Sequence, residues 1–308
     1  MALLAALAIA AGCGPGAEGP ARRPTTQDRD EFSVATYNLK HYSLEDRDGD
    51  GHRAEPKPEA ERRAVVAVLS RCRPDVLALQ EIGAAEVLEE LRRGLRAVGL
   101  DYPHVAQCVR PGQAVGLAVL SRHPIVARRV LTNDQYRIGT TNLPVLRGFL
   151  DVEIEPRPSY RFRLLVAHLK SKVYHPLGQT EMRRNEARLL AQHAHQILRE
   201  RSDANLLVVG DLNDSPDSAP LQRLLGEEER LLFDLRPADP LGDVWTHYSA
   251  TVDVYSRIDY GLASAGMVAE YVRDKSCVVR DPATLVASDH RPLLLVFRAS
   301  DAKPGPRP

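Results

Sequence analysis

The chain has 308 residues, which is enough for one large domain or two small ones. Lysine plus arginine equals aspartate plus glutamate at 41 each, so the formal net charge is zero, and the hydrophobic fraction of 44% is ordinary for a globular protein. This balance excludes bulk electrostatic attraction to nucleic acid, although a local basic cleft stays open.

The N-terminus contains a short apolar segment that ends at a cysteine. Residues 2–11 are apolar, and Ala11 and Gly12 directly precede Cys13. The segment is too short to span a bilayer and resembles a bacterial lipoprotein signal that is cleaved before a lipidated Cys13, although it lacks the usual basic residue at its start. An apolar first helix of the fold is the alternative. We expect an exported protein, anchored to the cell envelope by its lipid.

Strand and helix patterns follow one another through the rest of the chain. In chain order we expect a strand at 32–39, a helix at 58–72, a strand at 75–82, a helix at 84–100, strands at 114–122, 147–155 and 160–170, a helix at 180–201, a strand at 205–211, a helix at 218–225, and strands at 257–264 and 292–299.

The order of these elements predicts a layered α/β domain with mixed sheets, and not a purely parallel doubly wound fold. Strand 147–155 is expected to pair with both 114–122 and 160–170. No internal linker appears. We expect four parts in the chain: a signal segment at 1–13, a flexible Gly/Pro-rich tether at 14–30, one domain at 31–298 and a tail at 299–308.

Polar side chains suited to metal, water or phosphate stand at the ends of six expected elements. They are Asn38, Glu81, His168, Asp211, Asn213, Asp259, Asp289 and His290. One strand-end aspartate is usually structural, because Asp and Asn favour turns. A set of this size predicts that one rim of a sheet collects these groups in a cleft.

The chemistry of this set favours metal-assisted hydrolysis of a phosphate ester. Its oxygen ligands, without cysteine, suit Mg²⁺ or Mn²⁺ better than Zn²⁺. Glu81 and Asp289 are the expected carboxylate ligands beside a substrate phosphate, and a His–Asp pair would act as a general base. Gly210 is expected to let the chain turn sharply after its buried strand.

Six short motifs occur in one order along the chain. They are TYNLK (36–40), ALQEI (78–82), AHLKSK (167–172), GDLNDSP (210–216), RIDY (257–260) and SDHRP (288–292). This order resembles the endonuclease/exonuclease/phosphatase superfamily, which includes pancreatic-type deoxyribonuclease, AP endonucleases, inositol polyphosphate 5-phosphatases and bacterial sphingomyelinases. The resemblance covers about residues 32–298. It implies a four-layer α/β/β/α sandwich, like that of deoxyribonuclease I, in which two mixed β-sheets are flanked by helices and the site lies at one rim.

The resemblance also implies a role for each of the polar residues. Glu81 would bind the divalent metal, with Asn38 and Asp289 close by. His168 would hydrogen-bond the scissile phosphate, and Asp211 and Asn213 would orient the attacking water. Asp259 would orient His290. These five residues would form the catalytic group. Whether Asp211 or His290 is the base stays open.

Four further residues are candidate substrate contacts. Lys170 and Lys172 follow His168 and would favour a polyanion or a phosphodiester, while solvated loop charges are the alternative. Arg183 would share the cleft or pair with acids on its own helix. Tyr136 would touch substrate from its loop or be structural.

The segment DRDGDG resembles the start of a calcium loop, with Asp46, Asp48 and Asp50 as ligands. Its twelfth position, where a calcium loop needs a bidentate acid, is Lys57. A Ca²⁺ site is therefore a minor alternative to a hydrophilic insertion.

These observations lead to an exported endonuclease, similar to a deoxyribonuclease, as the main hypothesis, with nucleic acid as substrate. A phosphatase or phospholipase-type phosphodiesterase for inositol phosphates or sphingomyelin-like lipids is the alternative, and an inactive surface binding module is a third. Lys40 stands where the AP endonuclease pattern has aspartate, which lowers the case for abasic-site repair. We expect a monomer, and no protein partner is evident.

Overall fold

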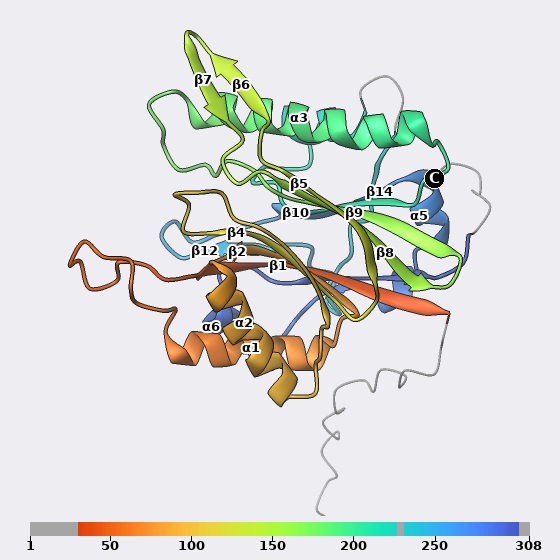
Figure 1. The fold of residues 1–308 in the computed structure, drawn as a ribbon, viewed down its shortest axis with the longest axis horizontal. Helices are drawn as coiled ribbons and strands as arrows, with labels where there is room; N and C mark the ends of the chain where they lie inside the picture. Colours follow the sequence, from red (N-terminus) through yellow and green to blue (C-terminus); the bar gives the residue numbers. More distant parts are fainter. Residues whose placement is uncertain (1–29, 227–230, 302–308) are drawn as a thin grey trace, which may run out of the picture.

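Two six-stranded sheets lie face to face and carry helices on their outer sides (Figure 1). The computed structural model describes residues 30–226 and 231–301. The predicted signal segment 1–13, the lipidated Cys13 and nearly all of the tether at 14–30 lie outside the described residues. Within the described part of the chain, no helix is long and apolar enough to cross a membrane.

The first sheet contains both ends of the described domain. Its strands, in spatial order, are β15 (Cys277–Val278), β16 (Leu293–Arg298), β1 (Glu31–Tyr42), β2 (Val76–Ile82), β4 (Gly116–Ser121) and β3 (His104–Cys108). Only β1 and β2 run parallel, and the other neighbours are antiparallel. Helices α1 (Glu59–Cys72), α2 (Ala85–Ala97) and α6 (Thr284–Ala287) cover its outer face.

The second sheet has a similar plan. Its strands, in spatial order, are β11 (Phe233–Asp234), β14 (Asp259–Ala263), β10 (Leu206–Asp211), β9 (Tyr160–His168), β8 (Phe149–Arg157) and β5 (Ile125–Leu131). Strands β9 and β10 run parallel, and the others antiparallel. Helices α3 (Gln179–Glu200) and α4 (Ala219–Leu225) cover its outer face, and α5 (Ala265–Glu270) and a 3₁₀ turn (Arg273–Lys275) lie at the end of the sandwich near the C-terminus.

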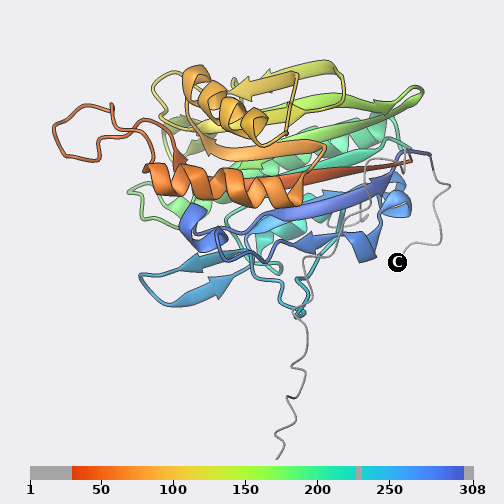
Figure 2. The same ribbon diagram turned by 90° about the horizontal axis from the view of Figure 1, so that it is seen from below.

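Two hairpins complete the chain. One joins β6 (Gln135–Ile138) to β7 (Thr141–Pro144), and the other joins β12 (His247–Ser249) to β13 (Val254–Ser256). Figure 2 shows that the loop 43–58 and the β12–β13 hairpin project from the same end of the sandwich. The predicted mixed-sheet sandwich with flanking helices is therefore confirmed.

One predicted strand pairing is correct and one is wrong. Strand β8 pairs with β9, as expected, but its other neighbour is β5 and not β4. Strand β4 lies in the other sheet, between β2 and β3. The sequence pattern missed β5 because this edge strand is mostly exposed and carries Arg128 and Arg129 in place of a buried apolar run.

The alternation of side chains along the strands explains where the site lies. Leu207 and Val209 of β10 belong to the core between the sheets, and Leu164 and Val166 of β9 face the same core. Because side chains alternate with a period of two, the next position on this face is Asp211 in β10 and His168 in β9. The polar residues thus continue the inner faces of the sheets beyond the apolar core.

Candidate active site

The eight predicted polar residues come together at one rim of the sandwich. Six of them are almost fully buried, with Asn38, Asp259, His168 and Asp211 each exposing 2% or less. The side chains of Glu81 and Asp289 are more open, at 15% and 30% exposed. The site is therefore closed on the core side, and solvent reaches it through these two carboxylates.

Asn38 joins the two sheets at the centre of the site. Its Nδ2 donates to Glu81 Oε1 at 3.1 Å in the first sheet and to Asp211 Oδ2 at 3.0 Å in the second. Its backbone carbonyl accepts a bond of 2.8 Å from the hydroxyl of Ser288, the residue before Asp289. One amide therefore fixes the spacing between carboxylates that are 130 residues apart in the chain.

Glu81 reaches the site because the backbone of β2 bends there. Strict alternation would direct Glu81 away from Gln80 and toward the outer face. Glu81 has a left-handed φ of 59°, and the register of β2 shifts between Gln80 and Ile82. Such a bulge redirects a side chain. The carboxylate also accepts the backbone N–H of His41 at 2.8 Å, and this histidine was not among the predicted site residues.

His290 is held by Asp259 on one side and faces Asp211 on the other. Its Nδ1 lies 2.8 Å from Asp259 Oδ2, and its Nε2 lies 3.8 Å from Asp211 Oδ2. Burial alone would lower the pKa of His290, but Asp259, and then Asp211 and Asp289, raise it to about 10. The predicted orientation of His290 by Asp259 is therefore present in the geometry.

Asp211 and His168 form the second half of the rim. His168 Nε2 lies 3.4 Å from Asp211 Oδ2 and 3.9 Å from Glu81 Oε1. Burial raises the pKa of Asp211 to about 7, and His290 opposes this rise while Asp259 adds to it. Burial, followed by the positive charges of Arg147 and His290, lowers the pKa of His168. At neutral pH His168 is an uncharged imidazole.

The turn after β10 presents Asn213. Asn213 has a left-handed φ of 55°, its backbone N–H bonds Asp211 Oδ1 at 2.9 Å, and its Nδ2 donates to Leu169 O at 3.0 Å. Leu212 is fully buried, as expected. Gly210, however, does not make the turn. It lies within β10 with a φ of 136°, and a Cβ there would be 1.9 Å from the carbonyl oxygen of Ala167 in β9.

The donor set fits a divalent cation. Two groups of possible ligands at the rim each have three ligand atoms within 4.8 Å of one another: Asp211, Asp259 and His290, and His247, Asp289 and His290. Several carboxylates lie close together here, and the raised pKa values of Asp211 and His290 show that protons balance this negative charge. A divalent cation would balance part of this charge and displace the proton of Asp211, while His290 keeps its own. Direct ligation by Glu81 stays a prediction.

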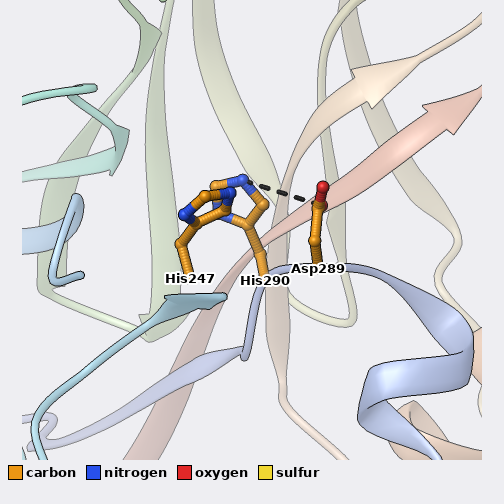
Figure 3. A group of neighbouring side chains, drawn as sticks. All are labelled: His247, Asp289 and His290. Carbon is orange, nitrogen blue, oxygen red and sulfur yellow. Dashed lines mark ion pairs between the residues drawn. The ribbon is translucent and has the colours of Figure 1, made fainter. Parts of the chain in front are cut away.

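Figure 3 shows His247 beside His290, with the carboxylate of Asp289 directed toward His290. The two imidazole rings have centroids 4.7 Å apart, and His247 Nδ1 lies 3.1 Å from Ser256 Oγ. An isolated bridge pairs the backbones of His247 and His290. His247 was not among the predicted site residues, and it lies in the segment WTHYS (245–249), seven residues before RIDY.

Arg147 was also missed. It stands just before β8, and β8 runs antiparallel to β9, with Phe149 opposite Ala167. The start of β8 must therefore lie beside His168 at the end of β9. The pairing of these two strands was therefore the feature from which the place of Arg147 could have been predicted. Arg147 Nη1 donates to Leu169 O at 3.3 Å.

Three predicted substrate contacts have other partners in the structure. Lys170 is 7% exposed, and its Nζ bonds the carbonyl oxygens of Ser171 and Val173. Arg183 is 4% exposed and pairs with Asp214 at 2.8 Å, and Tyr136 packs into the core beneath α3. Lys172 is exposed. Substrate contact by these four residues stays a prediction, and the geometry favours Lys172.

The acidic loop keeps Asp46, Asp48 and Asp50 together and exposed. Their carboxylates accept backbone N–H groups of the same loop. Lys57 at the twelfth position is buried and bonds Lys40 O and Glu61. A calcium loop of the usual kind lacks its acidic closing ligand here.

Comparison with known proteins agrees with this geometry. The model of the Endonuclease/Exonuclease/phosphatase family matches residues 35–290. No curated protein matches the sequence. Among solved structures, an endonuclease/exonuclease/phosphatase from Beutenbergia cavernae is 22% identical, with a TM-score of 0.62 over 88% of this chain and 72% of that one.

Two further structures share the fold. ANGEL2, a 2′,3′-cyclic phosphatase in complex with adenosine-2′,3′-vanadate, is 16% identical, with a TM-score of 0.63 over 88% of this chain and 96% of that one. Truncated TDP2 from Caenorhabditis elegans is 16% identical, with a TM-score of 0.59 over 87% and 98%. The family match spans all eight residues of the rim. The chain belongs to the endonuclease/exonuclease/phosphatase family.

Proposed function

We propose that this protein is a divalent-cation-dependent phosphodiesterase that cleaves nucleic acid as an endonuclease. The observation that carries the proposal is the series of polar contacts that runs across the rim from Asp259 to Glu81 and joins the two sheets. Such a set of preorganised acid, base and imidazole groups matches what hydrolysis of a phosphate ester needs.

The chain's own groups divide the work. Uncharged His168 donates a hydrogen bond to a non-bridging phosphate oxygen, and Asn213 with Asp211 orients the attacking water. Asp211 takes the proton from that water, because the raised pKa of His290 leaves it protonated and unable to act as the base. As the bond from water to phosphorus forms and the bond to the leaving oxygen breaks, the Nε2–H of His290 stabilises the negative charge on the phosphoryl oxygens and supplies a proton to the leaving oxygen.

A bound Mg²⁺ or Mn²⁺ would polarise the phosphate and balance its charge in the transition state. We assign Glu81 and Asp289, the most open carboxylates of the rim, as the groups that hold it, with Asn38 close by. Oxygen ligands next to solvent suit a cation that keeps several waters.

Two exposed lysines support a polyanionic substrate. Lys40 Nζ lies 3.4 Å from Asp289 Oδ2, at the open side of the rim, and its side chain is 52% exposed. Lys172 is exposed on the loop that follows His168. Both can meet phosphates that flank the scissile bond.

Plasmid cleavage tests this function. Protein lacking residues 1–13 is incubated with supercoiled DNA and Mg²⁺, Mn²⁺ or Ca²⁺, with and without EDTA. We expect EDTA-sensitive nicking, a loss of at least 10²-fold in His290→Ala, and full activity in His195→Ala, a helix histidine that bonds Leu224 O. The absence of EDTA-sensitive cleavage with all three cations would reject the nuclease.

A phosphatase or phospholipase-type activity is the second candidate. A formal net charge of zero and the similarity to ANGEL2, whose structure is described as that of a 2′,3′-cyclic phosphatase, favour it. Release of phosphate or phosphocholine from inositol phosphates or sphingomyelin, with DNA left intact, would select it over the nuclease.

We also propose that the mature protein is exported and held at the cell envelope by a lipid on Cys13. The apolar segment before this cysteine and the Gly/Pro-rich tether after it support the proposal. Membrane fractions should contain the wild-type protein, and Cys13→Ala should lose incorporation of a labelled fatty acid.

A further inference from the structure

Helix α3 directs two charged side chains inward, toward the loops of the rim. Glu186 is fully buried, and Arg183 is 4% exposed. Figure 1 shows that α3, which carries both residues, runs along the outer face of the second sheet. Charged side chains are seldom buried unless they make specific contacts.

Glu186 joins two loops that flank His168. Its Oε1 accepts the backbone N–H of Leu146 at 3.0 Å, and its Oε2 accepts the backbone N–H of Lys170 at 2.6 Å. The first contact fixes the residue before Arg147, and the second fixes a residue two positions after His168. The carboxylate thus sets the distance between the start of β8 and the end of β9.

Arg183 connects the second of these loops to a third. Its Nη1 donates to Lys170 O at 3.1 Å, and its Nε donates to Asp214 Oδ2 at 2.8 Å. Asp214 directly follows Asn213. Both peptide groups of Lys170 are therefore held by α3, and the turn that carries Asn213 is tied to the same helix.

The site depends on this arrangement because the loops contact one another. Arg147 donates to Leu169 O, and Asn213 donates to the same oxygen. Leu169 N in turn donates to Asp211 O at 3.0 Å. A shift of residues 168–170 would therefore displace a predicted phosphate contact and a water-orienting amide together.

We propose that Glu186, assisted by Arg183, is a positioning residue that holds the segments 145–148, 168–171 and 211–214 in their catalytic arrangement. It acts through His168, Asn213 and Arg147 and touches no substrate. This inference rests on the proposed phosphodiesterase activity only for its kinetic effect.

Glu186→Gln is the direct test. Glutamine keeps the size of the side chain but has a single acceptor oxygen, so its amide group faces one of the two N–H donors without bonding it. Glu270→Gln is the matched control, because Glu270, in α5 at the end of the sandwich near the C-terminus, is equally buried but accepts a hydrogen bond from the hydroxyl of Tyr160. A displacement of about 1 Å lowers a catalytic rate by up to about 10²-fold.

Two measurements are made on each full-length variant. Hydrogen exchange should show faster exchange in the peptides that contain Leu146 and Lys170 in Glu186→Gln and not in Glu270→Gln. At a temperature where both variants are folded, kcat for a phosphodiester should fall about tenfold to a hundredfold in Glu186→Gln, with a smaller change in KM, and stay at the wild-type value in Glu270→Gln.

The outcomes separate this inference from the proposed function. An inactive wild-type protein would reject the proposed function. The exchange measurement would still test whether Glu186 holds the backbone at Leu146 and Lys170. Unchanged exchange, unchanged kcat, or an equal loss of kcat in both variants would overturn the positioning role. If Glu186→Gln does not fold, Arg183→Lys replaces it, because lysine keeps the charge but loses the forked contact. This variant must then show faster hydrogen exchange in residues 168–171 and 211–214, together with a lower kcat.

Discussion

At the scale of single residues, the rim stores backbone strain. Eight non-glycine residues in the described ranges have a positive φ, and four of them are Lys40, His41, Glu81 and Asn213. Each such residue costs about 1–3 kcal/mol, which persists only where the surroundings enforce it. Because Glu81 and Asn213 need this conformation to reach the site, the strain is a cost of the site geometry.

Asp259→Asn should lower the pKa of His290, because it removes the carboxylate that most favours the imidazolium. Titration of the His290 ring signals by NMR in metal-free protein will check the direction. We expect kcat to fall by about 10²–10⁴-fold at the same time. A pKa of His290 that stays near 10 in this variant would contradict the assigned cause.

Asp211 and His290 should each make a contribution to the stability of the metal-free protein that falls as pH rises. The folded-state pKa of Asp211, about 7, lies above its unfolded value, so the native state binds more protons between about pH 4 and 7. The raised pKa of His290 continues this trend, because its stabilising effect is complete below about pH 6.5 and is lost as pH approaches 10. Asp211→Asn should flatten the lower part of a plot of Tm against pH and move the upper part to lower pH, because His290 loses one of the carboxylates that raise its pKa.

At the scale of elements, Gly210 permits the close contact of β10 with β9. Gly210→Ala should lower the free energy of unfolding by about 3–5 kcal/mol, because its Cβ would collide with the Ala167 carbonyl at an already unfavourable φ. Gly112→Ala is the control, with a φ of 80° and open space around the new Cβ, and should cost only about 1 kcal/mol. Denaturant unfolding measures both, and equal costs would show that the contact does not matter.

The sequence predicts those parts of the site that follow regular strands. Asn38, His168 and Asp211 continue the inward face of an apolar run, so their direction follows from a period of two. Glu81 does not follow, because its direction depends on a bulge that no local pattern announces. Its place at the rim was predicted from its position at the end of an expected strand, and the backbone conformation that achieves it was not.

Contacts that depend on the packing of loops and helices were beyond prediction, although the predicted pairing of 147–155 with 160–170 already placed Arg147 near His168. Arg147 and Glu186 act through loops whose neighbours are fixed only once β8, β9 and α3 are packed. Arg183 and Lys170 were predicted as substrate contacts because positive charge near a phosphate site suggests binding. Their burial against backbone carbonyls cannot be read from charge alone.

At the scale of the whole molecule, the site lies across the junction of two sheets. Asn38 and Glu81 belong to the first sheet, and Asp289 lies in the loop that leads into its strand β16, while His168, Asp211 and Asp259 belong to the second sheet. A cation bound among them would therefore favour the docked state of the sheets and stabilise the folded protein through its binding free energy.

Addition of Mg²⁺ should raise Tm, and the increase should be larger at pH 8 than at pH 6. The sign follows from competition, because the negative charge of deprotonated Asp211 beside the cation favours binding, and a proton neutralises this charge at lower pH. For a chain of this size about 1 kcal/mol corresponds to roughly 2–4 °C. Thermal scans at both pH values check this, and Glu81→Gln should reduce the effect.

The pairing of β1 with β16 brings Glu31 opposite Arg298, so the two ends of the domain are neighbours in one sheet. A short linker could join them covalently, and new ends could open at Gly49 or Gly51 in the exposed acidic loop. Such a circular permutant should fold and keep its rim. It would separate the contribution of chain connectivity from that of packing, since every strand keeps its neighbours while the order of synthesis changes.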